Sequence, residues 1–459
     1  MNKIATIAGL TWKAAFRYRL FWILCVLLAA AVAGLPLLLK DDGTAQGMVS
    51  ILLTYTLSAT ATLLGFATLW LSCGTLARDV EECQVQMVAV KPIARWQIWL
   101  GKWLGLLSLN AALLALAGAS IFIMLQWRAS RLSPEQQKIL REDIFVSRAS
   151  AKEPMPNLGP YVDDIMKHEV KDPSAMDPGD LLEKRRQIVE RLIAYKTVLP
   201  SGRARMWAID LHNLKDRLRD KRLQLRIKFH TASNRGESEF PTYWKVGPTN
   251  STRQAEMTES FPADSFQEFS LPNNLLDDQG RLWIEVGNPN SMDLTFPLED
   301  GIELLYPEST FGINFIRGLA VIFCWLALLA SIGLAAASFL SFPVAAFVSL
   351  AVLAIGLSSG TVATVVEQGT ITGFDAAKSG YGHSVVDYVF VPFFRATLKI
   401  LNLVQDFSPI DSLSSGRSIT WGQLGLAVAQ IIFLLSGFFC VMGIILFTRR
   451  ELATAQGNN

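Results

Sequence analysis

Residues Ala77–Gly105 read ARDVEECQVQMVAVKPIARWQIWLGKWLG and lie between two long apolar runs of the sequence. The stretch carries seven charged side chains and one proline, although Val49–Leu76 before it and Ile98–Trp127, which begins inside it, are mainly apolar. Apolar runs of about 20 residues match a bilayer core of roughly 30 Å, whereas a charged segment containing proline does not stay in hydrocarbon. The stretch therefore predicts two membrane-spanning helices joined by a polar loop.

The rest of the sequence continues this pattern. The chain has 459 residues, of which 51% are hydrophobic, and four further apolar runs have the length of a span: Phe21–Leu39, Phe315–Leu340, Pro343–Val366 and Trp421–Phe447. The first run is followed by KDDG, which offers no small-residue cleavage site, so we expect this run to be retained and not removed as a signal peptide. We predict an α-helical polytopic membrane protein with six transmembrane helices.

Lysine and arginine residues gather at the ends of particular runs. They precede the first run, occupy the loop between the second and third runs, and follow the last run: Lys3, Lys13, Arg17, Arg19, Arg78, Lys91, Arg95, Lys102, Arg449 and Arg450. These segments hold ten of the 42 basic residues but only four of the 40 acidic residues. Because basic segments remain on the cytoplasmic side, we predict that both termini face the cytoplasm of a bacterial cytoplasmic (inner) membrane.

Three regions follow from this topology. Residues 1–127 hold the first three spans, 128–312 form an extracytoplasmic α+β domain, and 313–459 hold the last three spans. In the insert, the apolar positions of Asp180–Lys196 recur at helical period, and we predict a helical part over 133–222 that also includes Glu135–Phe145 and Ala204–Lys221.

Residues 223–308 of the insert change to period two. Leu223, Leu225, Ile227 and Phe229 alternate with polar neighbours, and the stretches DSFQEFSLP, RLWIEVGNPN and GIELLYP add short strands bounded by turn residues. We predict an antiparallel β-sandwich. Such a module is either structural or binds an extracytoplasmic partner, and the sequence leaves both open.

Cysteine and histidine positions favour neither disulfides nor a metal site. All five cysteines lie in the apolar runs or the cytoplasmic loop, and the four histidines are far apart in the sequence. No Walker A pattern and no grouped catalytic residues occur, so we expect a chain that is not an enzyme and holds no cofactor.

The loop then shows a resemblance to a known family. Its acidic residues are followed by a lysine before proline, an arginine and a Gly-Lys pair, namely Asp79, Glu81, Glu82, Lys91, Pro92, Arg95, Gly101 and Lys102. This order resembles that of permeases of type-2 ABC (ATP-binding cassette) exporters. Residues 324–360, with the tight connection FLSFPV, resemble the fourth and fifth spans of that family, and FTRREL at 447–452 resembles its ending. The large insert departs from a minimal permease.

The resemblance implies that loop 77–97 is a coupling helix docked on a separate ATPase subunit, which would bind ATP and Mg. The residues implied in coupling are Arg78, Asp79, Glu81, Glu82, Lys91, Pro92 and Arg95. It also implies a second permease subunit, identical or different, and no nucleic-acid partner is expected. The alternative for the loop is a solvated hairpin whose charges only hold it in the cytoplasm.

Small polar residues concentrate in the second and fifth apolar runs. Those singled out are Thr54, Ser58, Thr62, Ser358, Ser359 and Thr361. They either let helices pack closely or line a translocation path, and in the resembled family these two spans meet at the interface between two permease subunits.

Two amphipathic segments flank the spans. The N-terminal KIATIAGLTWKAAFRYRLF is interpreted as an interfacial helix on the bilayer surface. Residues 367–418 are interpreted as an outer re-entrant or interfacial segment, with a plain amphipathic linker as the alternative.

The sequence thus favours the permease subunit of an ABC transporter that exports a cargo or acts outside the membrane. A second hypothesis is a membrane-anchored receptor or assembly protein whose β-sandwich binds an extracytoplasmic partner, and an integral membrane enzyme is a weakly supported third.

Overall fold

The computed structural model describes residues 3–17, 19–38, 44–82, 93–154, 157–170, 178–218, 221–231, 239–248, 253–298, 300–368, 374–375, 380–381, 387–405 and 407–450. The chain divides into two compact units. The first, here called the helical unit, comprises Met1–Val146 and Thr310–Asn459, and the second, the β unit, comprises Ser147–Ser309. The predicted insert 128–312 contains the β unit together with the end of one helix and a short helical connection.

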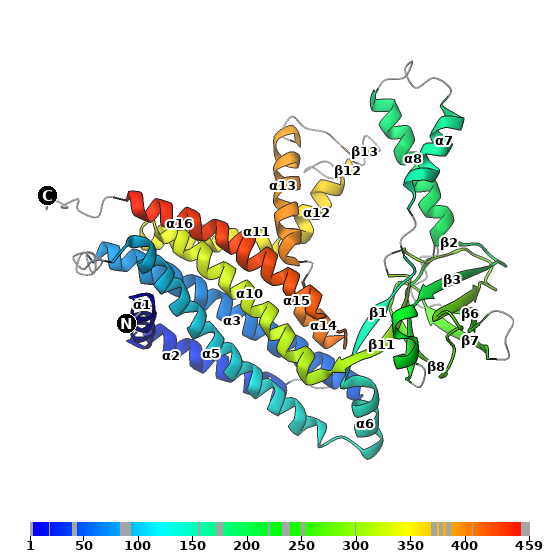
Figure 1. The fold of residues 1–459 in the computed structure, drawn as a ribbon, viewed down its shortest axis with the longest axis horizontal. Helices are drawn as coiled ribbons and strands as arrows, with labels where there is room; N and C mark the ends of the chain where they lie inside the picture. Colours follow the sequence, from blue (N-terminus) through cyan, green and yellow to red (C-terminus); the bar gives the residue numbers. More distant parts are fainter. Residues whose placement is uncertain are drawn as a thin grey trace. The chain divides into compact units, whose positions relative to one another are not determined.

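The helical unit consists almost entirely of helices (Figure 1). Its elements are α1 (Lys3–Arg17), α2 (Arg19–Leu38), α3 (Ala45–Glu81), α5 (Arg95–Ala129), α6 (Pro134–Ile139), the π-helix Leu140–Ile144, α10 (Phe311–Ala337), α11 (Phe342–Leu357), α12 (Ser359–Gln368), α13 (Asp387–Gln405), α14 (Pro409–Ser414) and the continuous series α15 (Trp421–Ala427), π-helix Val428–Ser436 and α16 (Gly437–Arg449). Two short strands, β12 (Phe374–Asp375) and β13 (Gly380–Tyr381), pair antiparallel.

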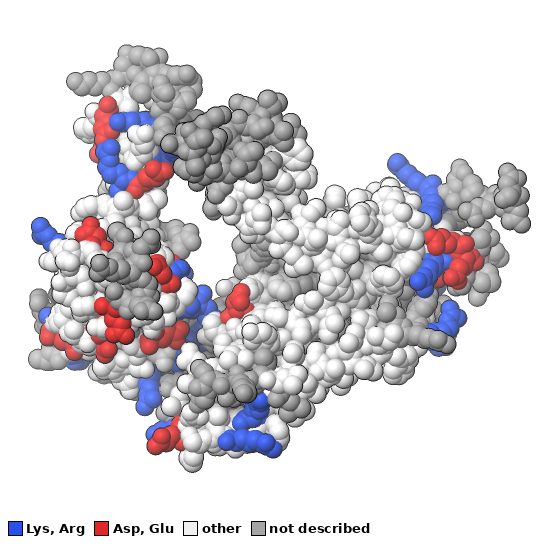
Figure 2. All heavy atoms as spheres, turned by 180° about the vertical axis from the view of Figure 1, so that it is seen from behind, with Lys and Arg blue, Asp and Glu red and all other residues white. Residues whose placement is uncertain are grey.

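Four of these helical segments are long and apolar enough to cross a membrane: α3, α5, α10 and the series Trp421–Arg449. Two bent pairs, Lys3–Arg17 with Phe21–Pro36 and Phe342–Leu357 with Gly360–Val366, raise the number to six if each pair is one span. Figure 2 shows a broad surface without charged side chains along the helices, with charges gathered at the end that carries the last residues of α16. The prediction of a mostly helical protein with several helices long and apolar enough to span a membrane is confirmed.

The fifth predicted span, Pro343–Val366, is not one straight helix. It bends by 63° between α11 and α12. The break falls at a Ser-Ser-Gly sequence, where the Ser358 hydroxyl donates 2.9 Å to the carbonyl of Ala354. Serine side chains that bond to the backbone of the preceding turn, followed by glycine, favour helix kinks.

Helix α10 is the central helix of the bundle and packs against α3, α5, α11 and α16. Two tryptophans of α5 donate to serines of α10, Trp99 to Ser338 at 3.1 Å and Trp103 to Ser331 at 3.2 Å. On the α3 side, a Cβ built on Gly333 would meet the Ser72 hydroxyl at 1.9 Å. Close contact at small residues and hydrogen bonds between helices therefore hold the helices together, as expected where lipid removes most of the hydrophobic drive.

The described residues of the β unit form these strands: β1 (Val146–Ala151), β2 (Val198–Leu199), β3 (Ala204–Asp210), β4 (Leu223–Ile227), β5 (His230–Thr231), β6 (Glu239–Val246), β7 (Ala255–Pro262), β8 (Gln267–Leu271), β9 (Arg281–Gly287), β10 (Leu294–Thr295) and β11 (Ile302–Thr310). One sheet has the order β3-β9-β6-β7 and is antiparallel throughout. The other has the order β1-β11-β4-β8, in which β11, β4 and β8 pair antiparallel.

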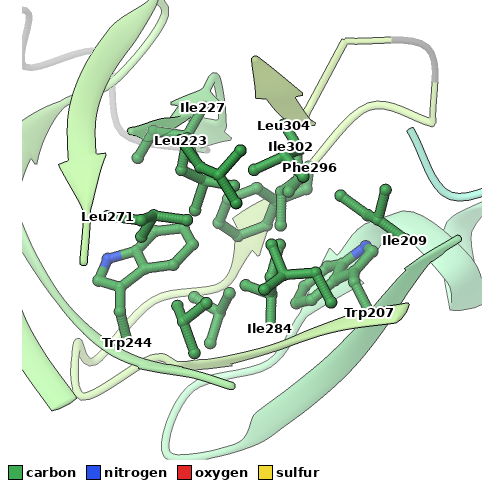
Figure 3. Close-up of a cluster of buried hydrophobic side chains, with 14 of the residues drawn as sticks. Trp207, Ile209, Leu223, Ile227, Trp244, Leu271, Ile284, Phe296, Ile302 and Leu304 are labelled. Carbon is green, nitrogen blue, oxygen red and sulfur yellow. The ribbon is translucent and has the colours of Figure 1, made fainter. Parts of the chain in front are cut away.

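The two four-stranded sheets share one hydrophobic core (Figure 3). Ile209 and Ile284 come from one sheet, Leu225 and Leu304 from the other, and all four are fully buried. Strands β6 and β9 show the clean alternation of buried and exposed residues expected of a sheet with one covered face. The predicted alternating positions of 223–227 and 282–286 do face this core.

The predicted helical part 133–222 is wrong over several stretches. β1, β2 and β3 lie within it, and Ala204–Asp210, predicted as helix, is strand β3. Trp207 and Ile209 are its buried residues, at period two, and seven residues of β3 pair with β9. The charged residues that follow, 215–218, form only a one-turn helix, α9 (Lys215–Leu218), after a short 3-10 turn (His212–Leu214).

Two helices of the β unit form a hairpin, α7 (Gly159–Glu169) and α8 (Pro178–Thr197). Glu169 joins them, because its carboxylate lies 3.0 Å from Lys184 Nζ and 2.9 Å from Arg191 Nη1. Hydrogen bonds from Lys184 and Arg191 lower the pKa of Glu169 below its ordinary value. The amphipathic helix predicted for Asp180–Lys196 is thus confirmed as α8, and it packs against α7.

Candidate functional site

The candidate site is the end of the helical unit that adjoins the predicted coupling loop in the sequence, here called the loop end. α3 ends there at Glu81 and α5 begins at Arg95. A side chain of α3 reaches the first residue of α11, a side chain of α5 reaches the last residues of α16, and α5 also packs against α1. Five helices therefore meet around the two ends of one short polar segment.

A buried ion pair connects the two helices that flank the loop. Lys102 Nζ of α5 lies 2.5 Å from Asp79 Oδ2 of α3 and donates 2.6 Å to the carbonyl of Thr75. The Lys102 side chain is only 9% exposed and that of Asp79 30% exposed. A buried ammonium without a partner is strongly unfavourable, so the pair fixes the α3–α5 hairpin at its mouth.

Glu81, the last residue of α3, caps a different helix. Its carboxylate accepts a hydrogen bond of 2.8 Å from the backbone nitrogen of Phe342, the first residue of α11. The N-cap residue Ser341 makes no side-chain cap bond, so Glu81 supplies an acceptor for the α11 N-terminus and its negative charge matches the positive end of the helix dipole. Arg78 adds a cation–π contact, with its guanidinium carbon 4.4 Å from the Phe342 ring centroid.

Arg95, the first residue of α5, caps a helix end from the other side of the loop. Its Nη1 donates to the carbonyls of Phe447, Thr448 and Arg450 at distances between 2.8 and 3.0 Å. These are the carbonyls at the C-terminus of α16, which have no partners within the helix and favour a positive charge. Arg450 Nη1 in turn donates a hydrogen bond of 3.3 Å to the backbone carbonyl of Ser338 at the end of α10.

Helix α1 lies against the start of α5 through two glycines. A Cβ at Gly101 would stand 2.7 Å from Ile7 Cβ, and one at Gly105 would stand 2.7 Å from Thr11 Cβ. Trp12 also donates 2.7 Å to the Ser108 hydroxyl of α5. The Gly-x-x-x-Gly spacing lets two helix backbones approach closely, so α1 is docked on α5 and not only amphipathic.

The loop end thus gathers most of the predicted coupling residues. Arg78, Asp79, Glu81 and Arg95 each contact another helix, and Glu82 is the C-cap residue of α3, donating its backbone N–H to the Arg78 carbonyl at 2.8 Å. Lys91 and Pro92 lie outside the described residues. Whether these residues couple to a partner remains a prediction.

Sequence reasoning missed the contacts of four residues. Phe342 donates its backbone N–H to Glu81, and Arg450 accepts from Arg95 and donates to the end of α10. Gly101 and Gly105 form the surface against which α1 packs. The four-residue spacing of the two glycines is visible in the sequence and indicates close packing of a second helix. Phe342 and Arg450 had no such signal, because a capping contact 261 residues apart in sequence leaves no local pattern.

The predicted pathway residues do not form one group. Thr54 and Ser58 of α3 are half-buried and Thr62 is exposed. Ser358 ends α11, Thr361 is exposed on α12, and the side chain of Ser359 is outside the description. Two buried threonines of α3 bond their own helix, Thr56 to the Leu52 carbonyl and Thr68 to the Leu64 carbonyl, both at 2.6 Å, and Thr68 also lies 3.1 Å from the side-chain oxygen of Asn110 on α5. A pathway role for these positions stays a prediction.

Apart from the loop end, a hollow lies on the helical unit between α5 and α10. Its volume is about 720 Å³, and its lining is apolar, from Ala115, Gly118 and Phe122 on α5 to Ile316 and Leu319 on α10. Within the described residues, no group of three or more His, Cys, Asp or Glu side chains is placed to hold a metal ion.

Comparison of the chain with protein-family models, with curated proteins and with solved structures finds no match.

Proposed function

We propose that this chain is the transmembrane permease subunit of an ABC transporter complex, with ATP and Mg bound by a separate ATPase subunit. The observation that carries the proposal is the pair of caps on either side of the loop. Glu81 before it holds the N-terminus of α11, and Arg95 after it holds the C-terminus of α16. A partner that displaces the loop would therefore act on two spans besides those that the loop joins.

The two caps and the buried ion pair differ in how they respond to displacement. A helix cap contributes about 1 kcal/mol and acts only over a hydrogen-bond distance, so a shift of a few ångströms at Glu81 or Arg95 breaks it. The buried pair of Asp79 and Lys102 meanwhile keeps α3 and α5 together. In the proposed mechanism the α3–α5 hairpin moves as one body and the ends of α11 and α16 follow or are released.

The proposal includes the finer topology. Each bent helix pair is taken as one span, which makes six spans, with both termini and the loop end in the cytoplasm and the β unit outside. Two such subunits, identical or different, and two ATPase subunits form the complex. It exports a cargo or changes the conformation of the extracytoplasmic domain.

Copurification from native membranes tests the proposal. A tagged chain is expected to retain a nucleotide-binding subunit and to support vanadate-sensitive ATP hydrolysis. Glu82→Lys, an exposed charge at the end of α3, is expected to lose this subunit, whereas Arg449→Glu, an exposed charge at the same end outside the loop, retains it. Retention of the ATPase by both variants would show that the loop is not the docking element, and absence of any ATPase from the parent would reject the function.

The alternative function is a membrane-anchored receptor or assembly protein that works through the β unit. The observation in its favour is the separate hydrophobic core of that unit, which includes the fully buried Trp244 and Phe229. A chain that copurifies with an extracytoplasmic protein and with no ATPase would favour this alternative.

A further inference from the structure

A group of buried polar side chains lies where α10 begins and where the turn before α15 crosses it. Asn314 of α10 donates 2.7 Å to the carbonyl of Arg417 and accepts 2.8 Å from the backbone nitrogen of Ile419. Asn314 is 1% exposed, so these bonds fix the turn against the helix. We call Asn314, Arg317, Arg417, Ser418 and Trp421 the arginine corner.

Arg317 is the central group of this corner. It is 6% exposed, its Nη1 donates 2.9 Å to the Ile419 carbonyl, and its guanidinium carbon lies 4.4 Å from the Trp421 ring centroid. Its Nε is buried without an acceptor. Among the residues that the structure describes, no carboxylate oxygen lies within 4 Å of the guanidinium nitrogens of Arg317. One carbonyl and one aromatic face do not balance a buried guanidinium, which calls for a counter-charge.

A neighbour of Arg317 adds a hydrogen-bond donor. The Ser418 hydroxyl is buried and makes no hydrogen bond in the described part of the chain. Arg417, one residue earlier, has a partner of its own, so the charge that the corner offers is that of Arg317. The acidic residue of the preceding helix α14, Asp411, accepts from the Ser408 hydroxyl. The corner therefore offers a guanidinium edge and a hydroxyl that are complementary to an oxyanion.

We propose that the arginine corner binds the phosphate group of an anionic phospholipid. Arginine is the side chain best suited to bind phosphate oxygens in pairs, and Trp421 is 66% exposed at the start of an apolar helix, where tryptophans lie at headgroup level. α10 and the series beginning at Trp421 are both long and apolar enough to span a membrane, so their adjoining ends lie at its surface. A free phosphate has the same chemistry but no hydrocarbon to place it there.

Native mass spectrometry of the full chain, reconstituted with equal amounts of phosphatidylglycerol and phosphatidylcholine, tests this assignment. The parent is expected to retain at least one more phosphatidylglycerol than Arg317→Gln, and phosphatidylglycerol is expected to raise the thermal midpoint of the parent but not that of Arg317→Gln. Arg131→Gln is the matched control, because Arg131 also stacks on a tryptophan, 3.7 Å from Trp127, but is exposed at the end of α5. It should behave as the parent does.

A second variant and a measurement with inorganic phosphate distinguish a lipid site from a site for a soluble oxyanion and from no site. Arg317→Lys keeps the positive charge without the paired donors and is expected to retain phosphatidylglycerol weakly. If Arg317→Gln does not fold, Arg317→Lys takes its place in the comparison with the parent. Equal retention of phosphatidylglycerol by the parent and both Arg317 variants, or equal retention of the two lipids by the parent, would overturn the site. If inorganic phosphate alone raises the parent midpoint as much as the lipid does, the lipid assignment is wrong and the ligand is a soluble oxyanion.

Discussion

Lys102 of α5 and Asp79 of α3 form an ion pair of 2.5 Å near the ends of the two helices that flank the predicted coupling loop. The two residues are 23 positions apart, yet the pair lies within one turn of the Glu81 cap on α11. The geometry of the hairpin is thereby set by a buried contact inside the bundle. The charged residues of the segment between the two helices are therefore not needed to fix this geometry.

Removal of one partner of this pair is expected to be asymmetric. Asp79→Asn leaves a buried ammonium and should cost about 3 kcal/mol or more, whereas Lys102→Met leaves a carboxylate that is already partly hydrated and should cost less. The double variant should recover most of the loss, and thermal midpoints in detergent measure all three. Additive losses in the double variant would show that the two side chains are not coupled.

A larger residue at Gly101 should undock α1. Gly101→Val places a Cβ 2.7 Å from that of Ile7, and overpacking of this kind costs roughly 1–3 kcal/mol. A cysteine at Thr11, which is 4% exposed, should become reactive towards maleimide in this variant and not in the parent sequence. Gly9→Ala is the control, since nothing lies within 4 Å of its added Cβ. Unchanged Thr11→Cys reactivity would mean that the glycine contact does not hold α1.

The shared core of the β unit predicts the effect of a buried charge. Ile284 is fully buried, so Ile284→Asp should destabilise the β unit by more than about 3 kcal/mol. Limited proteolysis of the full chain should then cleave within 147–309 while the helices stay intact. Ala204→Asp, at an exposed position of the neighbouring strand, should resist cleavage like the parent. Equal resistance of Ile284→Asp would refute the core assignment.

The α7–α8 hairpin should weaken in acid. Lys184 and Arg191 lower the pKa of Glu169 below its ordinary value, so its contribution is fully present above about pH 4.5 and is lost as the pH falls through the lowered value. Hydrogen exchange of α7, corrected for the intrinsic pH dependence, should therefore speed up at low pH. Glu169→Gln should remove this pH dependence and Glu190→Gln, which alters an exposed pair with Arg186, should keep it. A parent without any acid effect would contradict the assignment.

Labelling of intact cells checks the orientation. In a chain whose native cysteines are replaced, an impermeant maleimide should modify Ser260→Cys, an exposed residue of β7, and should leave Thr448→Cys, exposed near the end of α16, unmodified until the cells are opened. The basic residues near both termini underlie this expectation. The reverse pattern would place the β unit in the cytoplasm and reject the proposed topology.

The parts of the fold that could be predicted from the sequence are those with a local period. Long apolar runs identified the spanning helices, and alternation at 223–227 and 281–287 identified β4 and β9. β6 carries the same alternation, with Phe240, Thr242, Trp244 and Val246 buried, and was available to the same reasoning. β3 was misread as helix because charged residues that follow it continue a helical composition.

The candidate site was predictable only in part. The charged residues of the loop stand out in an apolar sequence, but the helix that each one caps depends on contacts formed by folding across more than 200 residues. The arginine corner was overlooked because Arg317 lies inside an apolar run and its partners, such as Ile419, are about 100 residues further on. Capping and burial of single polar groups are properties of tertiary structure and have no sequence period.

The docking of α1 on Gly101 and Gly105 also has a consequence for biogenesis. The surface that receives Ile7 and Thr11 does not exist until residue 105 has left the ribosome, about 90 residues after α1 itself. During that interval the amphipathic α1 has no protein face to cover its apolar side, and the membrane surface or an insertion factor must hold it. Helix α1 therefore reaches its final position only after the later-synthesised α5 is present, and truncated chains that end before α5 should expose it.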